Sequence, residues 1–576
     1  MGDRFHRLPR IALGSTGAGW LAAGLRRWRS PVERARYRVL EEDYRVSREQ
    51  LHDITLGMSP EATGRIAWMV SSFHTVWGFK MEGALSLALR LRGYRPKAVH
   101  LTSAWWARKY HRLFGLSESI DLPASLGGAR GRRAGDALAA EFLRRPRGIA
   151  ELLALEFQGV AVGRIALSNV LNQRKFTRID LADRQTAVSI SETLGRSARS
   201  VCAVEDLLRR ERPAVALLLE KGVSPMAELF GVCVREGVPV IQYAGAQKID
   251  LYALKRYSMA NRSDHPLSLD AGSWDRAQAI PWSGETDRAL MQELEQGYRR
   301  ATWFNRKFLH DGKRIKSAEE VREQLHLDPR KKTAVIFSHV LWDATFFYGV
   351  GLFDDYETWL LETVKAACAN PRLNWVIKIH PDLVWKLKCE GFAGELRDVI
   401  ALRSAVGRLP DHVTIVLPDT DIDTFSFFEI TDYCLTVRGT IGIEMACHGV
   451  PVLTAGTGRY AGLGFTIDSQ SKPEYLARLK ALEALPPLTQ TQVELARRYA
   501  HAVFRCRPWE MRSFRTVKAP LNQTGHPLDA NLIPHVRTFA DCAAAGDLQA
   551  FAAWVDSDDV DFLCLDAAAD RECAAS

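Results

Sequence analysis

The sequence predicts an α/β protein with two doubly wound domains in tandem, followed by C-terminal helices. Three observations favour this fold class. The length of 576 residues exceeds what a single hydrophobic core normally fills. Short, nearly continuous apolar runs alternate with amphipathic segments, which is typical of parallel sheets covered by helices on both faces. The alternation occurs in two series, and a charged helical connection at 286–328 separates them.

The first series lies between residue 60 and about residue 300. Its expected strands are "RIAWMVSSFH", "KAVHLT", "PAVALLLE" and "VPVIQYAG". Its expected helices are "KMEGALSLALRLRGY", which follows the first strand, and "PMAELFGVCVREG", which follows the third. A strand, a helix and a second strand in this order make a βαβ unit. We therefore expect one Rossmann-like domain here.

The second series repeats the pattern. Its expected strands are "TAVIFSH", "NWVIKIHP", "VTIVLP", "YCLTV" and "PVLTA", with helices at 357–369 and 424–430. The tail from about residue 485 is expected to be helical. The predicted parts are a basic N-terminal leader (1–59), an N-terminal Rossmann-like domain (60–300), a C-terminal Rossmann-like domain (301–484) and a C-terminal helical segment (485–576).

Composition excludes several classes of protein. A hydrophobic content of 47% and a charged content of 25% are ordinary for a folded soluble domain. The net charge of +9 fits anionic substrates or a membrane surface, and no nucleic-acid-binding motif accompanies it, so we expect no nucleic acid partner. The ten cysteines occur singly, without zinc spacing, which indicates reduced thiols in a cytoplasmic protein.

The N-terminal leader allows two interpretations. Its apolar part, Ile11 to Leu25, is shorter than the about 20 residues that a membrane-spanning helix needs, and no signal-peptide cleavage site follows it. It is either a basic amphipathic segment on an anionic membrane surface or a solvated leader, and the second is favoured. We expect a cytoplasmic protein, with peripheral attachment to the inner face of the plasma membrane left open.

Polar residues gather where the strands of the second series end, and the ligand crevice of an open parallel sheet lies outside the carboxyl ends of its strands. Ser338 and His339 follow "TAVIF". Lys378 and His380 follow "NWVI" two residues apart, so both side chains should leave the strand on one face. An ammonium beside an imidazole suits a phosphate and a leaving group, and we favour this over a structural role.

A second polar group follows "YCLTV". Arg438 and Gly439 form a sharp turn, and Thr440 begins a helix of about eight residues that ends at Gly449. Free backbone N–H groups at a helix start favour an anion, and the Thr440 hydroxyl adds a donor. Glu444, one turn on, is placed to accept hydrogen bonds from a ribose or sugar hydroxyl.

A further glycine loop, "AGTGRY", ends the next strand and carries Arg459 and Tyr460. Glycine at both ends of a short helix is also common in α/β proteins for purely structural reasons. The arginines and the glutamate shift the interpretation towards an anion site.

The pattern Asp-x-Asp at Asp419 and Asp421 resembles a metal-binding pair of some sugar transferases. It lies just before a helical segment, where acidic residues cap helices, so capping is the favoured interpretation. We therefore expect neither a metal site nor a cofactor.

The first domain offers candidates for the group that acts on an acceptor hydroxyl. Such a group is a general base or a nucleophilic carboxylate. The loops after the expected strands supply His74, Glu220 and Asp250, and each is a weak signal by itself.

With these residues identified, the chain resembles the capsule-polysaccharide biosynthesis group of bacterial glycosyltransferases. The resemblance rests on "WVIKIHP", a Lys-x-His-Pro element, and on "VRGTIGIEMACHGVPVLTAGTGRY", and it covers roughly residues 330–470. It implies a GT-B fold of two Rossmann-like domains, with the acceptor in the first and a nucleotide-activated donor in the second. The donor residues implied by the motif match are Lys378, His380, Thr440 and Glu444.

Relatives of this kind are similar in using CMP-activated acidic sugars such as Kdo, whereas others with a His-Pro element transfer polyol phosphate from CDP-glycerol. Arg438-Gly439-Thr440 stands where many of them have serine or asparagine. We expect a metal-independent glycosyltransferase that extends a surface polysaccharide or a lipid-linked acceptor. A teichoic-acid-type polyol phosphotransferase and a catalytically silent scaffold are the alternatives.

Overall fold

The computed structural model describes residues 31–565, apart from 58–63, 72–74, 103–104, 123–125, 127, 146–147, 304–311, 344, 384–394, 519–527 and 529. The chain forms two compact units, each assembled from separate stretches of sequence. Unit 1 comprises Met1–Arg132, Cys202–Pro213 and Arg512–Ala552, and unit 2 comprises Arg133–Val201, Ala214–Met511 and Ala553–Ser576. The domain boundaries at residues 60, 300 and 484 stay a prediction.

Unit 1 holds a parallel sheet and the helices that follow its strands. Its elements are α2 (Pro31–Leu56), β1 (Arg65–Ser71), α3 (Val76–Arg90), β2 (Tyr94–His100), α4 (Trp105–Leu113), β3 (Ser119–Asp121), β14 (Phe514–Lys518), β15 (Ala530–Pro534) and α21 (Phe539–Ala545). β1 pairs in parallel with β2, and β2 with β3. The antiparallel hairpin of β14 and β15 lies in the tail, where only helices were expected.

The second half of the predicted leader is the helix α2, and its apolar side is buried, including Leu51 and Ile54. A polar contact also ties it to its neighbours. Asp43 forms an ion pair with Lys80 of α3 at 3.0 Å and accepts a hydrogen bond from the Tyr110 hydroxyl of α4 at 2.7 Å. The apolar stretch from Ile11 to Leu25, on which the membrane interpretation rests, lies outside the described residues.

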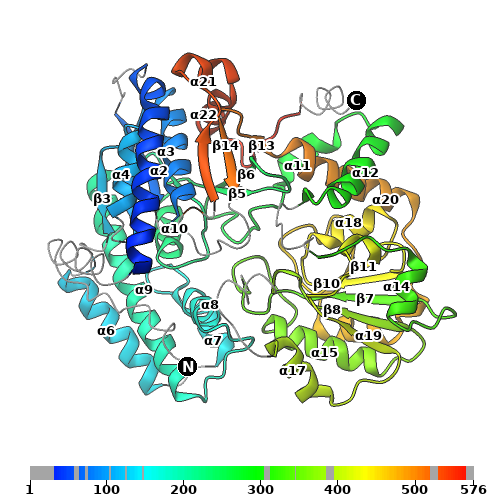
Figure 1. Cartoon of the computed structure of the whole chain (residues 1–576). Coiled ribbons are helices and arrows are strands. Elements are labelled where there is room, and N and C mark those ends of the chain that lie inside the picture. The colour runs from blue at the N-terminus through cyan, green and yellow to red at the C-terminus, as the bar shows by residue number, and fades with distance from the viewer. Residues whose placement is uncertain are drawn as a thin grey trace. The chain divides into compact units, whose positions relative to one another are not determined.

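Unit 2 contains the second strand series. Its six-stranded sheet has the order β12-β11-β10-β7-β8-β9, and every neighbouring pair is parallel. These strands are β7 (Thr333–Phe337), β8 (Asn374–Lys378), β9 (Val413–Val416), β10 (Tyr433–Thr436), β11 (Val452–Thr454) and β12 (Ile467–Asp468). Helices cover both faces (Figure 1), so the predicted α/β class with doubly wound parallel sheets is confirmed.

The helices around this sheet are α11 (Ala271–Gln278), α12 (Gly284–Arg299), α14 (Ala318–Gln324), α15 (Tyr356–Cys368), α17 (Arg397–Val406), α18 (Ile441–Cys447), α19 (Lys472–Lys480) and α20 (Gln490–His501), with the 3₁₀ helix η2 (Thr424–Phe427), the 3₁₀ helix η3 (Leu482–Ala484) and the π-helical turn η4 (Ala502–Cys506). On one face Trp359 of α15 donates to the Tyr475 hydroxyl of α19 at 3.1 Å. On the other face Trp303, Phe427 and Phe504 belong to one buried apolar cluster.

The order of strands defines a switch point. From β7 the chain proceeds through β8 and β9 to one edge of the sheet, and it then returns to β10, beside β7, and continues to the opposite edge. The loops that follow β7 and β10 therefore diverge at the carboxyl end of the sheet. In open parallel sheets this is where ligands bind.

Unit 2 also contains the end of the first strand series. Its elements are α7 (Ile149–Leu153), α8 (Val162–Arg174), β4 (Val215–Leu218), α10 (Met226–Arg235), β5 (Val240–Gly245), β6 (Leu251–Tyr257) and β13 (Trp509–Glu510). β4 and β5 are parallel, and β6 returns antiparallel to β5. The chain passes between the two units within α6 (Ala129–Arg144), α9 (Arg184–Glu211) and α22 (Asp547–Asp556), and also between Pro213 and Ala214 and between Met511 and Arg512.

Among the described residues, no helix combines the length and apolarity that crossing a membrane requires.

Candidate anion site at the strand ends of unit 2

Five segments of unit 2 meet beside the switch point, and we call them the loop cluster: residues 219–222, 258–270, 338–354 without 344, 437–440 and 455–460. Backbone hydrogen bonds tie them together. Gly349 N–H donates to the Ser263 carbonyl at 3.1 Å, and His265 N–H donates to the Gly458 carbonyl at 3.2 Å. Gly351 and Gly456 form an antiparallel bridge. The loop after β7, in which the sequence assigned a role only to Ser338 and His339, thus joins the segments after β6 and β11.

Two arginines of the cluster lack partners for part of their guanidinium groups. Arg438, after β10, is 6% exposed, and Arg459, after β11, is 9% exposed. Nε and Nη1 of Arg438 and Nε and Nη2 of Arg459 are buried without a hydrogen-bond partner. Buried donors are almost always paired, and an unpaired one carries a desolvation cost. The two side chains are therefore suited to receive an anion.

Glycine allows the Arg438 guanidinium to lie against the backbone of the neighbouring loop. A Cβ added at Gly456 would lie 3.0 Å from Arg438 Nη2 and 2.9 Å from a methyl carbon of Val437. The guanidinium carbon also lies 5.9 Å from the centre of the Tyr356 ring. The glycine loop "AGTGRY" was predicted to stand beside Arg438, and the structure brings the two together.

Ser338 and His339 accept hydrogen bonds from neighbouring backbone, and donor binding by these two residues stays a prediction. The Ser338 hydroxyl accepts from His380 N–H at 2.9 Å, and His339 Nε2 accepts from Val437 N–H at 3.2 Å. His339 also stacks on Tyr356 with ring centres 4.6 Å apart. Burial and the nearby charges of His380 and Arg438 hold the pKa of His339 well below its ordinary value, so the ring is neutral.

The turn at Gly439 is held by Tyr460. The Tyr460 hydroxyl donates to the Gly439 carbonyl at 2.7 Å, and the ring is 1% exposed. A Cβ at Gly442 would lie 2.1 Å from the same hydroxyl oxygen, so only glycine fits there. Tyr460 therefore braces the Arg-Gly-Thr loop, and direct donor binding by this residue stays a prediction.

The helix that begins after Thr440 is shorter than expected. It is α18, of seven residues, and the Thr440 hydroxyl makes no capping hydrogen bond. Thr440 is half-buried, and donor binding by its hydroxyl stays a prediction. A helix of two turns supplies a weak dipole, which leaves the arginines as the main source of positive charge at this site.

Glu444 is more deeply engaged than the sequence suggested. It is 1% exposed, and it accepts hydrogen bonds from the Tyr298 hydroxyl and from Trp303 Nε1, the latter at 3.3 Å. Burial raises its pKa above the ordinary value of 4.5, although those hydrogen bonds and the charge of Arg459 act in the opposite direction. Both oxygens thus already have protein donors, and ribose binding by Glu444 stays a prediction.

Lys378 and His380 have different neighbours, although they are only two positions apart in the sequence. Lys378 is 3% exposed, and its Nζ lies 5.5 Å from the Phe427 ring centre. Burial, followed by the charge of Lys313, lowers its pKa to about 7, while Asp423 acts in the opposite direction. His380 Nδ1 accepts from Asp382 N–H at 3.2 Å. The structure shows no common partner for the two among the described residues.

A cavity of about 320 Å³ adjoins the neighbours of Lys378. Its lining residues are Tyr298, Arg299, Ala301, Lys313, Arg314, Ile315 and Asp423. Its size is at the low end of the range for small-molecule sites. Because Tyr298 also donates to Glu444, the cavity lies close to two of the predicted donor-binding residues.

Glu220 is the best placed of the predicted catalytic groups. Its Oε1 accepts from Gly222 N–H at 2.8 Å and from the Tyr348 hydroxyl at 2.9 Å. No described residue donates to its Oε2. Burial raises the pKa of Glu220, opposed by those two hydrogen bonds. A half-buried carboxylate with one oxygen fixed and one available can accept a proton.

The other two predicted catalytic groups are not supported in the same way. Asp250 occupies the turn between β5 and β6 with a φ of 60°, and its carbonyl accepts from Met511 N–H at 2.9 Å. His74 lies outside the described residues. Both roles stay predictions.

The sequence missed two residues of the loop cluster, His265 and Tyr348. Their ring centres are 4.7 Å apart, and His265 Nδ1 accepts from Leu267 N–H at 3.0 Å. His265 precedes Pro266, as His380 precedes Pro381, and this repeated His-Pro pair is the signal that could have identified it. Tyr348 lies in an irregular segment without a motif.

The cap of η2 is Asp423, and not Asp419 or Asp421, for which capping was expected. Asp423 accepts from Phe425 N–H at 2.9 Å, and Asp421 accepts from Lys316 at 2.6 Å. Within the described ranges, no group of three or more His, Cys, Asp or Glu side chains could hold a metal ion.

Comparison with known proteins supports the resemblance over part of the chain. Residues 291–493 match the family described as capsule polysaccharide biosynthesis protein. This segment contains both motifs on which the resemblance rests, so the prediction of a capsule-type relative is confirmed there. No curated protein is significantly similar in sequence to the chain.

Several solved structures are similar at low identity. The β-Kdo 2,4-transferase of KpsC from Thermosulfurimonas dismutans shares 13% identity, covers 51% of this chain and 80% of its own, and has a TM-score of 0.32. The β-Kdo 2,7-transferase of the same KpsC shares 14%, covers 60% and 89%, and has a TM-score of 0.31. The UDP-GlcNAc 2-epimerase of Neisseria meningitidis shares 12%, covers 76% and 97%, and scores 0.26. Scores this low carry no inference about activity.

Proposed function

We propose that the protein is a glycosyltransferase that moves a sugar from a nucleotide-activated donor to a surface polysaccharide or glycolipid acceptor. The observation that carries the proposal is the pair of buried, partly unpaired guanidinium groups of Arg438 and Arg459. They stand at the switch point of a parallel sheet, in a segment that matches capsule polysaccharide biosynthesis proteins. Guanidinium groups match phosphate in charge and in hydrogen-bond geometry.

In this proposal the two arginines bind the phosphate of the donor. Negative charge accumulates on that phosphate as the bond to the sugar breaks. Preorganised positive charge at this point stabilises the transition state, which is the role that a metal ion fills in other transferases. The Thr440 hydroxyl, on the same loop as Arg438, adds a donor to the phosphate.

Glu220 acts on the acceptor in this proposal. Its available Oε2 takes the proton of the acceptor hydroxyl as the oxygen attacks the sugar carbon. The raised pKa makes Glu220 a stronger base than a solvated carboxylate, while the donors on Oε1 keep the group oriented. The cavity beside Lys313 and Asp423 is a suitable place for the nucleoside.

Melting temperatures test the nucleotide first. Titration with CMP, UDP, GDP and ADP should raise the melting temperature for one of them, because a ligand that binds the native state stabilises it. Arg438→Met and Arg459→Met should each remove that shift. Lys331→Met, at a half-buried position just before β7, is the matched control and should keep it.

Turnover tests the reaction. The activated sugars of the nucleotide identified by melting are incubated with the protein, and release of that nucleotide is measured. Release from a nucleotide sugar supports the proposal. Production of CMP from CDP-glycerol, with no turnover of any nucleotide sugar, would instead establish a polyol phosphotransferase. Absence of nucleotide binding would favour the scaffold.

A further inference from the structure

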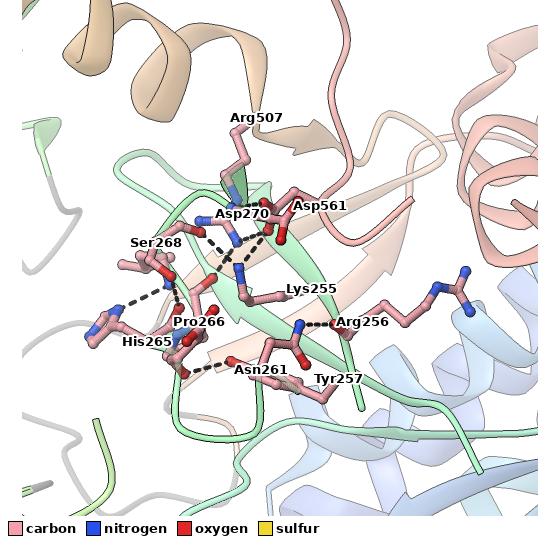
Figure 2. Close-up of polar contacts among 12 residues, drawn as sticks. Lys255, Arg256, Tyr257, Asn261, His265, Pro266, Ser268, Asp270, Arg507 and Asp561 are labelled. Carbon is pink, nitrogen blue, oxygen red and sulfur yellow. Dashed lines mark hydrogen bonds and ion pairs between the residues drawn. The ribbon is translucent and has the colours of Figure 1, made fainter. Parts of the chain in front are cut away.

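His265 lies on a loop whose shape is set by buried contacts. Figure 2 shows the loop between β6 and α11 with its polar contacts. On one side of the loop, the Lys255 ammonium donates to the Ser268 carbonyl at 3.1 Å and pairs with Asp561 at 3.0 Å, and both charged groups are fully buried. Asp561 also accepts from Asp270 N–H at 2.6 Å. These contacts hold the loop before any ligand arrives.

The opposite side of the loop is equally constrained. Lys221 donates to the carbonyls of Arg262 and Asp264, at 2.5 and 2.8 Å. The Tyr257 hydroxyl donates to the same Asp264 carbonyl at 3.1 Å. The His265 N–H then bonds the Gly458 carbonyl, one residue before Arg459. The backbone of His265 is thus fixed beside the segment that carries Arg459.

The tautomer of His265 follows from its contacts. Nδ1 accepts from Leu267 N–H, so in the neutral ring the proton is on Nε2. Burial, and then the charges of Arg459 and Arg438, hold the pKa of His265 well below its ordinary value, so the ring is neutral at physiological pH. No described residue accepts a hydrogen bond from Nε2. The imidazole therefore presents one N–H donor and no positive charge.

Tyr348 connects this ring to Glu220. Its own ring lies against His265, and its hydroxyl donates to Glu220 Oε1. One side chain thus contacts both the histidine beside the arginines and the carboxylate assigned to the acceptor. Tyr348 comes from the loop after β7, whose glycine at 349 has a φ of 67° and lies against the backbone of Thr457.

We propose that His265 is a ligand of the donor phosphate, donating its Nε2–H to the anion that Arg438 and Arg459 bind, and that Tyr348 is a positioning residue for both His265 and Glu220. This inference rests on the proposed function and extends it to two residues outside the sequence motifs. A cation is a poor occupant for the site, because the charges of Arg438, Arg459 and Lys221 all act on His265.

Two amide substitutions separate the donor role from the structural one. In His265→Asn the amide oxygen can still accept from Leu267 N–H, but the donor at Nε2 is lost. In His265→Gln the amide nitrogen reaches about the position of Nε2 and can donate. Inorganic pyrophosphate is the probe, because its binding does not depend on the nucleoside, and calorimetry measures its affinity.

We expect His265→Asn to weaken pyrophosphate binding by about 10-fold or more, as for the loss of a hydrogen bond to a charged group. His265→Gln should recover part of the loss. Tyr348→Phe, which keeps the ring and removes the hydroxyl, should leave pyrophosphate affinity unchanged and lower kcat. Tyr348→Ala, which removes the stacked ring, should weaken binding as well.

The result that would overturn the inference is wild-type affinity in His265→Asn while Arg438→Met abolishes binding. In that case the proposed function stands and only the role of His265 is wrong. If the wild-type protein binds neither pyrophosphate nor any of the four nucleotides, the proposed function itself fails. An unchanged circular dichroism spectrum and melting temperature in His265→Asn would show that a loss of affinity is not caused by misfolding. Equal losses of pyrophosphate affinity in His265→Asn and His265→Gln would contradict the donor role.

Discussion

Replacing Arg438 by methionine should make the protein more stable and unable to bind its anion. Nε and Nη1 of Arg438 are buried without partners, and each unsatisfied buried donor costs about 1–3 kcal/mol. Methionine keeps most of the aliphatic stem and has no donor. Two such donors cost about 2–6 kcal/mol, so after about 1 kcal/mol for imperfect packing Arg438→Met should raise the free energy of unfolding by roughly 1–5 kcal/mol.

The assay is thermal melting with and without sodium pyrophosphate. Without the anion, the melting temperature of Arg438→Met should exceed that of the wild type by about 2–20 °C, since 1 kcal/mol corresponds to about 2–4 °C for a domain of 150–250 residues. With the anion, the wild type should gain stability and the variant should not. A site that binds charge at the cost of stability behaves in this way.

The matched control is Arg497→Met on α20. The Arg497 guanidinium has partners, donating to the Cys447 carbonyl at 2.9 Å and pairing with Asp287 at 2.7 Å. Its loss should lower the melting temperature and leave the response to pyrophosphate intact. If Arg438→Met is destabilised as much as Arg497→Met and still responds to pyrophosphate, the interpretation of Arg438 as an anion ligand is wrong.

Three further predictions concern single groups. Gly442→Ala should lower the free energy of unfolding by about 1–3 kcal/mol, because its Cβ would meet the Tyr460 hydroxyl. In chemical denaturation, the double variant with Tyr460→Phe should lose less stability than the sum of the two single variants. Glu220→Gln should lower kcat about 10²–10⁴-fold with unchanged nucleotide affinity by calorimetry; equal loss of affinity would contradict its role as base. Lys378→Met should stabilise the protein most below pH 7, because burial lowers the pKa of Lys378 from 10.5 to about 7. The buried charge therefore destabilises the folded state fully below pH 7 and no longer above pH 10.5. A difference in urea stability between variant and wild type that is constant from about pH 6.5 to 10.5 would contradict this.

The strands and their end loops could be predicted because their signals are local. The apolar runs from 333 to 454 appear as β7 to β11, and the Arg-Gly-Thr loop and the glycine loop after β11 meet at Arg438 as expected. The length and type of a short helix were harder to predict from the sequence. The segment at 424–430 was expected to be a helix, but it holds only the four-residue 3₁₀ helix Thr424–Phe427, with Asp423 as its cap, and a turn after it.

The partners of the site residues could not be predicted, since they come from distant parts of the chain. Glu444 is covered by Tyr298 and Trp303, about 140 residues earlier, and nothing in the short helix indicates that its carboxylate is buried. The strand β6 was missed because it contains Lys255 and Arg256, which are unusual in a buried strand. The charge of Lys255 is compensated by Asp561, which no local pattern reveals.

The pairing of Lys255 with Asp561 also sets an order of events during synthesis. The two residues are separated by 306 positions, so at 5–20 residues per second the ribosome makes Asp561 roughly 15–60 s after Lys255. Until then, the ammonium and the Arg507 guanidinium beneath the His265 loop lack the carboxylate that pairs with both. A nascent chain should therefore bind the anion only after its final segment has emerged and folded back.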